Sequence, residues 1–199
     1  MKSRNKSQTF RLTILGVLTA IVVIQTFIPF LGYIPIGPLS LTIIPITVIL
    51  TAIVFGPKNG AIVGGVWGMI TFIRAFVAPT SPLAPIIFTN PLISVLPRIL
   101  IGITAGSTYY FLEKSIISNA RAMRIAALIG SLTNTFLVLG LTYIFYKVPY
   151  ANAYNIDVTE VLPTILYILV TNGIAEAILS FIIAPIVAKP LLKFMKTSS

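Results

Sequence analysis

The sequence predicts an all-α integral membrane protein that folds as a single bundle of six transmembrane helices. Of its 199 residues, 57% are hydrophobic and 9% are charged, whereas about 25% of the residues in a soluble domain are charged. The mean hydropathy is +1.01, and six long apolar runs follow one another along the chain. Because roughly 20 apolar residues cross a hydrocarbon core about 30 Å thick, these runs leave no room for a separate soluble domain.

The first three predicted spans are residues 11–30, 39–55 and 61–77. The first follows the basic segment MKSRNKSQTFR, and it is longer than the 7–15-residue apolar region of a signal peptide and has no clear A-x-A cleavage site. We therefore expect it to be retained as a helix. The second and third runs are short, so their limits are the least certain.

The last three predicted spans are residues 91–112, 123–145 and 161–183, the sixth being able to continue towards residue 194. In this arrangement Lys147 alone lies in a loop on one side of the membrane. The basic residues on the other side are Lys2, Arg4, Lys6, Arg11, Lys58, Lys114, Arg121, Arg124, Lys189, Lys193 and Lys196. The positive-inside rule then places both termini in the cytoplasm. The net charge of +10 is explained by contact with anionic lipid and does not call for a nucleic-acid partner.

Missing residue types exclude much chemistry. The chain has no Cys and no His, which excludes disulfides, Cys/His zinc sites and imidazole or thiol mechanisms. It has no G-x-x-x-x-G-K-[ST] phosphate loop. Of its four acidic residues only Glu176 lies well inside a span, so paired carboxylates for catalysis or for a metal are absent. We expect no catalytic residue, no metal and no cofactor.

Four polar side chains from four spans are expected to share one layer of the membrane. A helix rises about 1.5 Å per residue, which puts Arg98 and Arg74 roughly 10 Å below the outer boundary of a core about 30 Å thick. Asn134 and Asn172 lie about 14 and 16 Å below it by the same count. A central arginine costs about 2.5–3.5 kcal/mol on insertion scales and usually marks a site or pathway.

Polar neighbours extend this layer. Asn90 and Ser94 precede Arg98 at intervals of four residues, so all three share one helix face. Glu176 shares a face of the sixth span with Asn172. Such faces turn towards the bundle interior because lipid cannot satisfy their hydrogen bonds. The candidate substrate-binding residues are therefore Arg98, Asn134, Asn172, Glu176, Arg74, Asn90, Ser94 and Ser131, with Thr89 and Trp67 as further candidates.

Structural roles remain alternatives for several of these residues. Serine and asparagine often join helices, at about 0.6 kcal/mol each. Arg98 can form an ion pair with Glu176, and Arg74 can reach outwards to lipid headgroups. If both arginines face the cavity with one glutamate, one positive charge is left over. A carboxylate ligand held in a fork-like pair by guanidinium would neutralise that charge, and the asparagines would bind amide or hydroxyl groups.

Two segments carry a resemblance to a known family. The run GPLSLTIIPITVILTAIVFGPKNGAIVGGVWG at 37–68, together with FTNPLISVLPRILIG at 88–102, resembles the substrate-binding S components of energy-coupling factor (ECF) vitamin transporters, and most of all the pantothenate-specific members. The resemblance extends over nearly the whole chain. It implies a high-affinity vitamin-binding subunit of the bacterial cell membrane. Pantothenate has a carboxylate, an amide and two hydroxyls, which fits the expected pocket.

The resemblance also implies partners and loops. Such subunits deliver their substrate to a transmembrane coupling subunit and two ATP-binding subunits, and they dock through a small-x-x-x-small surface on the first helix, for which this chain has Gly16 and Ala20. The stripe of Gly60, Gly64 and Gly68 is expected to serve internal packing. The loops 31–38, 78–90 and 147–157 would roof the site, the proline-rich middle one as a lid.

Three other functions are compatible with a small membrane protein of this composition. The substrate can be another small anionic vitamin. A self-sufficient carrier or channel would need inverted repeats or a polar path through both leaflets, whereas the deep polar residues gather in the outer half. A small membrane enzyme would need a deep lysine to activate Ser94 or Ser131, and no span has one.

Overall fold

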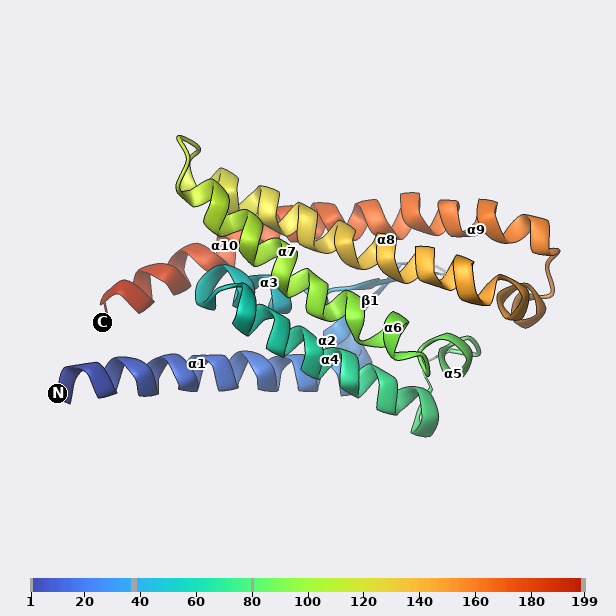
Figure 1. Ribbon diagram of the computed structural model, residues 1–199, viewed down its shortest axis with the longest axis horizontal. Helices are drawn as coiled ribbons and strands as arrows, with labels where there is room; N and C mark the ends of the chain where they lie inside the picture. The colour runs from blue at the N-terminus through green and yellow to red at the C-terminus, as the bar shows by residue number, and fades with distance from the viewer. Residues whose placement is uncertain (1, 37–38, 80, 198–199) are drawn as a thin grey trace.

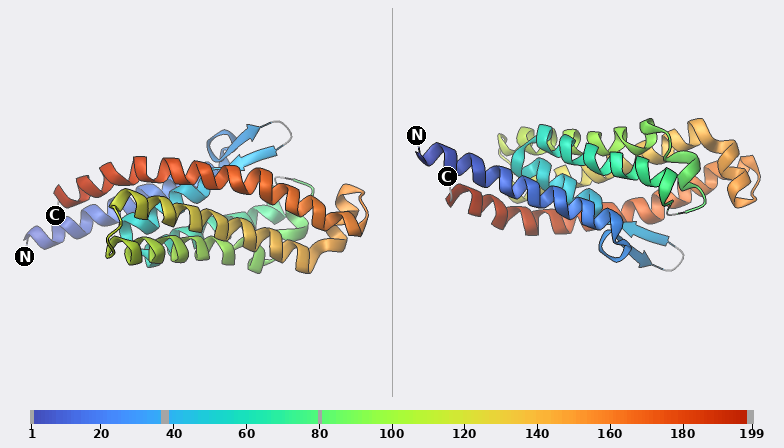
Figure 2. Two further views of the ribbon diagram at one scale, coloured as in Figure 1. Left: turned by 90° about the horizontal axis from the view of Figure 1, so that it is seen from above. Right: turned by 90° about the horizontal axis from the view of Figure 1, so that it is seen from below.

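The protein is an elongated bundle of helices that lie side by side (Figure 1). The computed structural model describes residues 2–36, 39–79 and 81–197. The helices along the long axis are α1 (Lys2–Phe27), α4 (Pro57–Val77), α7 (Leu96–Glu113), α8 (Asn119–Tyr154) and α10 (Ile174–Thr197). Both ends of the chain lie at the same end of the bundle (Figures 1 and 2).

Five segments of the described residues are long and apolar enough to cross a membrane. They are Thr9–Phe27, Pro57–Val77, Pro91–Glu113, Asn119–Tyr154 and Val158–Met195. This confirms the prediction of an all-α membrane protein that crosses the membrane several times. Five of the six predicted spans coincide with these segments, and the second does not.

The second predicted span, 39–55, contains a much shorter helix, α3 (Ile44–Phe55). Its 12 residues make a helix about 18 Å long, less than the roughly 30 Å of a hydrocarbon core. All 12 are buried, because α3 is surrounded by α1, α4, α7, α8 and α10. A helix that is apolar on every side is one that proteins bury completely, so α3 forms the centre of the main hydrophobic core.

A small hairpin stands between α1 and α3, after the short helix α2 (Pro29–Gly32). Strands β1 (Tyr33–Ile36) and β2 (Leu39–Thr42) are antiparallel and pair Tyr33 with Thr42. The hairpin projects from the side of the bundle beside α1 and α10 (Figure 2). The predicted loop 31–38 is thus partly strand, and its residues Gly37 and Pro38 lie outside the described part of the chain, as does Thr80 in the loop 78–90.

Glycines bring α4 directly onto the backbone of α7. A Cβ atom at Gly64 would collide with the carbonyl oxygen of Arg98, and one at Gly68 would lie 2.7 Å from the Cα atom of Val95. Only residues without a side chain permit so close an approach. The expectation that this glycine stripe serves internal packing is confirmed.

The remaining elements are short or irregular. The connection between α4 and α7 holds α5 (Ala84–Ile87) and α6 (Pro91–Ser94). Helix α8 continues to Tyr154, beyond the predicted limit at 145, with a kink at Tyr146 and Pro149 inside it. The last crossing consists of η1 (Val158–Glu160), α9 (Val161–Ile168), the π-helical turn η2 (Leu169–Gly173) and α10.

Candidate ligand-binding site

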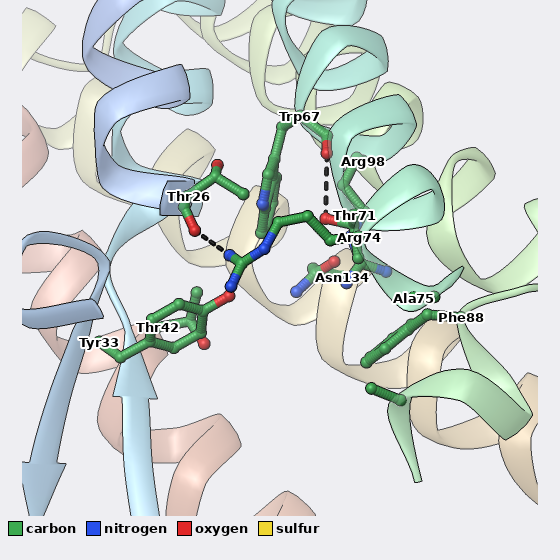
Figure 3. A pocket seen from close by; sticks show the side chains of 11 residues that line it. Thr26, Tyr33, Thr42, Trp67, Thr71, Arg74, Ala75, Phe88, Arg98 and Asn134 are labelled. Carbon is green, nitrogen blue, oxygen red and sulfur yellow. Dashed lines mark hydrogen bonds between the residues drawn. The ribbon is translucent and has the colours of Figure 1, made fainter. Parts of the chain in front are cut away.

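One cavity of about 130 Å³ lies among α1, the hairpin, α4, α5, α7 and α8. Its walls come from segments distant in sequence, from the end of α1 to the middle of α8. Figure 3 shows the side chains around it. The polar and aromatic residues on which the site chemistry depends are Tyr33, Thr42, Trp67, Arg74, Arg98 and Asn134.

The position of Arg98 follows from the proline before it. Pro97 has no N–H, so the carbonyl of Ile93, four residues earlier, receives no helical hydrogen bond from it. Arg98 Nη1 donates to that oxygen at 2.5 Å. The side chain is only 5% exposed. The bond therefore holds a buried guanidinium group at the start of α7.

Two aromatic rings flank this guanidinium group. Its central carbon lies 5.0 Å from the centre of the Trp67 ring and 5.3 Å from that of Phe88, within the range of cation–π attraction. Trp67 is on α4, and Phe88 follows α5 in the 78–90 loop. The close contact of α4 with α7 brings the indole to Arg98, so the glycine stripe also shapes the site.

Arg74 approaches the cavity from the last turn of α4. Its Nη1 donates to the carbonyl oxygen of Thr26, which lies in the last turn of α1, where carbonyl groups have no partner within the helix. The guanidinium carbon is 5.6 Å from the centre of the Phe27 ring. Arg74 therefore lines the cavity and joins α4 to the segment that leads into the hairpin.

Four buried polar atoms of the cavity residues have no hydrogen-bond partner among the residues described. They are Trp67 Nε1, Arg74 Nε, Arg98 Nε and Asn134 Oδ1. The first three are donors and the last is an acceptor. Buried polar groups are nearly always paired in native proteins. Three donors and one acceptor around one cavity fit a ligand that carries an anionic acceptor group and a separate hydrogen-bond donor.

The charge around the cavity is positive. Arg74 and Arg98 line it, and no acidic side chain does so within residues 2–36, 39–79 and 81–197. Glu176 accepts a hydrogen bond from the backbone N–H of Thr42 at 2.7 Å. In the same described ranges no ion pair joins Arg98 to Glu176. An anion in the cavity would be the direct counter-ion of both guanidinium groups.

Three of the eight residues expected from the sequence meet at this cavity, namely Arg74, Arg98 and Asn134. The other five lie outside its wall. Asn90 Oδ1 accepts the N–H of Leu92 at the start of α6, and its Nδ2 donates to the Tyr146 hydroxyl at 3.3 Å. Ser94 donates to the carbonyl oxygen of Asn90.

The remaining three residues differ in burial. Ser131 is buried one turn before Asn134, and its hydroxyl has no partner in the described structure. Asn172 is half-buried in the π-helical turn η2, and Glu176 is half-buried on α10. Sequence reasoning did not identify Tyr33, Thr42 or Phe88, because they lie in segments that were interpreted as a span end and as loops.

Similar proteins are known. Residues 10–188, which include every residue that lines the cavity, match the family described as "ECF transporter, substrate-specific component". The chain is 31% identical over 193 residues to the pantothenate transporter PanT of Leuconostoc mesenteroides subsp. mesenteroides, with 94% of each chain covered. It is 31% identical over 208 residues to the pantothenic acid transporter PanT of Lactococcus lactis subsp. cremoris, with 97% of this chain and 99% of that one covered.

Proposed function

The chain belongs to the family of substrate-specific components of ECF transporters, and from that premise we propose that it is the pantothenate-binding subunit of an ECF importer. Both similar proteins described above are named for pantothenate transport. One structural observation carries the proposal furthest. Two guanidinium groups, from α4 and α7, meet at one cavity whose described wall has no acidic side chain.

The carboxylate of pantothenate is the proposed partner of this charge. Arg98 and Arg74 each have a buried Nε donor without a partner, and Trp67 adds an indole N–H. A carboxylate offers about four acceptor sites, and charge-assisted hydrogen bonds from arginine are about twice as strong as neutral ones. Binding would remove the desolvation cost of three unpaired donors at once.

The uncharged part of the ligand is proposed to contact Asn134. Its buried Oδ1 needs a donor, which a pantothenate hydroxyl or the amide N–H supplies. We place Arg98, Arg74, Asn134 and Trp67 in contact with the ligand. The five expected residues outside the cavity wall are proposed to position the residues that contact the ligand. They are Asn90, Ser94, Ser131, Asn172 and Glu176.

Transport is proposed to require other subunits. The chain has no phosphate loop for ATP, so we infer that a transmembrane coupling subunit and two ATP-binding subunits drive import and that this subunit is not an enzyme. Gly16 and Ala20 are the proposed docking residues. Both are exposed on α1, and a Cβ atom at Gly16 would meet nothing within 4 Å.

The proposed topology has six crossings in the bacterial cell membrane. The hairpin and α3 together would make the second crossing, since irregular backbone is tolerated at membrane depth where it lines a cavity. Both termini lie at one end of the bundle (Figure 2), as an even number of crossings requires. We assign that end to the cytoplasm by the positive-inside rule.

Equilibrium binding of radiolabelled pantothenate to the purified protein in detergent, without partner subunits or ATP, tests the proposal. Competitors should include riboflavin, folate and thiamine, together with pantothenol, in which an alcohol replaces the carboxylate. Displacement by pantothenate alone is the expected result. Strong competition by pantothenol would contradict the role of the carboxylate, and binding of another vitamin instead would contradict the assigned substrate.

A further inference from the structure

The β1–β2 hairpin supplies part of the cavity wall. Tyr33 and Thr42 face each other across the ladder, and both line the cavity. A two-stranded hairpin is only marginally stable by itself. Its place in the wall therefore depends on contacts with neighbouring helices.

One such contact comes from the opposite end of the sequence. The Glu176 Oε1 atom on α10 accepts the backbone N–H of Thr42 at 2.7 Å, across 134 positions of the chain. Glu176 itself does not line the cavity. A hydrogen bond from a backbone N–H to a carboxylate is short and strong compared with a neutral one. The Glu176 carboxylate thus holds the cavity wall at Thr42, a residue that lines the cavity.

The burial of Leu41, the residue before Thr42, shows that β2 packs against the bundle. Leu41 is 5% exposed, and β2 lies against η2 and α10. We expect that separation of β2 from η2 and α10 would expose Leu41 and open the cavity wall at Thr42 in the same movement.

We propose that Glu176 is a positioning residue that holds the hairpin against α10 and thereby sets how long the ligand stays bound. For the identity of the ligand this inference rests on the function proposed above. The attachment of the hairpin is independent of that identity. Glu176 acts through Thr42 and makes no contact with the ligand.

The first test is the rate at which radiolabelled pantothenate dissociates from the purified protein. Loss of a hydrogen bond to a charged group in Glu176→Ala should raise this rate about 10- to 100-fold. Glu176→Gln keeps a side-chain oxygen that accepts the Thr42 N–H, but as a weaker, neutral acceptor, so its rate should rise less than in Glu176→Ala and stay within about tenfold of wild type. The exposed Glu160 provides the control, and Glu160→Ala should leave the rate unchanged.

The second test needs no ligand. Because the chain has no cysteine, Leu41→Cys introduces a single thiol whose reaction with a maleimide reports exposure of the strand. Labelling should be slow in an otherwise unchanged protein, at least about tenfold faster with Glu176→Ala, and clearly slower with Glu176→Gln than with Glu176→Ala. Ala126→Cys is the matched control, since Ala126 is 0% exposed in the main core and should remain unreactive in each background.

Three results would overturn the proposal. Equal increases of the dissociation rate in Glu176→Ala and Glu176→Gln, with Leu41→Cys still unreactive, would mean that the charge of Glu176 matters and not its hydrogen bond to Thr42. Faster labelling of Ala126→Cys as well would indicate general loosening. Unchanged rates of dissociation and labelling in Glu176→Ala would show that Glu176 does not position the hairpin. If instead pantothenate fails to bind wild type while Leu41→Cys responds as expected, the proposed substrate is wrong and the positioning role stands.

Discussion

Individual residues of the cavity hold one another in place before any ligand is present. Pro97 frees the Ile93 carbonyl, which then accepts from Arg98, and the Trp67 and Phe88 rings flank the guanidinium group. A rigid, oriented side chain loses little entropy on binding. The buried arginine is thereby prepared to form a paired contact with a carboxylate.

Replacement of Arg98 should therefore be the most damaging single change to binding. Arg98→Ala leaves a buried carboxylate without its main partner, which costs about 2–5 kcal/mol, or roughly 30-fold to several-thousand-fold in Kd. Arg98→Lys keeps the charge and loses the planar fork, so a smaller loss is expected. Radiolabelled pantothenate binding measures both, with Arg121→Ala, an exposed arginine, as control. Wild-type affinity in folded Arg98→Ala would refute the role.

Trp67 offers a direct optical readout, because it is the one tryptophan of the chain. Its indole N–H is buried without a partner at the cavity, so pantothenate should change the intrinsic fluorescence and pantothenol should change it far less. Trp67→Phe keeps a ring beside Arg98 and removes the N–H, which should weaken binding about 10- to 100-fold if the N–H reaches the carboxylate. Unaltered affinity in Trp67→Phe would show that the ring alone matters.

At the scale of elements, the contact between α4 and α7 decides the distance from Trp67 to Arg98. Gly60 and Gly102 pack against each other at one end of this contact, and Gly68 packs against Val95 at the other. In a membrane, close packing of small residues is a main source of helix association. The same surface that stabilises the bundle thus sets the geometry of the site.

An added methyl group at Gly64 should disturb both stability and binding. Its Cβ would collide with the Arg98 carbonyl oxygen, and overpacking of this kind typically costs about 1–3 kcal/mol. Gly65 is the matched control one position along, where a Cβ would meet Ile99 Cγ1 at an ordinary 3.5 Å. Thermal unfolding in detergent should show a lower midpoint for Gly64→Ala and little change for Gly65→Ala. Equal midpoints would contradict the close-packing argument.

At the scale of the whole molecule, the exposed face of α1 is the proposed contact with the coupling subunit. Apolar side chains such as Leu12 and Val17 are 68% and 53% exposed there, and a Cβ atom at Gly16 would meet nothing within 4 Å. Helix α1 begins at the end of the bundle where both termini lie (Figure 1). None of these three residues lines the cavity, so the proposed docking face and the proposed ligand site are distinct.

A bulky residue on this face should separate the two functions. Gly16→Leu should abolish copurification with the coupling and ATP-binding subunits while pantothenate affinity stays at the wild-type value, because Gly16 lines no part of the site and precedes Thr26, the first cavity residue of α1, by about 15 Å of helix. Gly140 also has nothing within 4 Å of an added Cβ, so Gly140→Leu serves as the control and should retain the complex. Normal assembly of Gly16→Leu would exclude this face as the docking surface.

The fold class and three cavity residues could be predicted from the sequence alone. The fold class depends on the summed hydropathy of many residues, and the cavity residues were found mainly through the high free-energy cost of a charged side chain inside a membrane. Long apolar runs predicted the helical membrane protein, since a bilayer accepts few other structures. The expense of a buried guanidinium group singled out Arg98 and Arg74, and the depth estimate joined them with Asn134 and Asn172. Arg98, Arg74 and Asn134 line the cavity, whereas Asn172 lies outside its wall.

The tertiary structure decided what depends on contacts between distant segments. Residues 39–55 are apolar enough for a span, yet the partners around α3 leave it as a short central helix, and residues 39–42 pair with β1 instead. Likewise Glu176 and Asn172 share a helix face with polar character, but only the packing of the hairpin on α10 directs Glu176 to the Thr42 N–H. Periodicity describes one helix at a time, whereas a cavity wall is made where several elements meet.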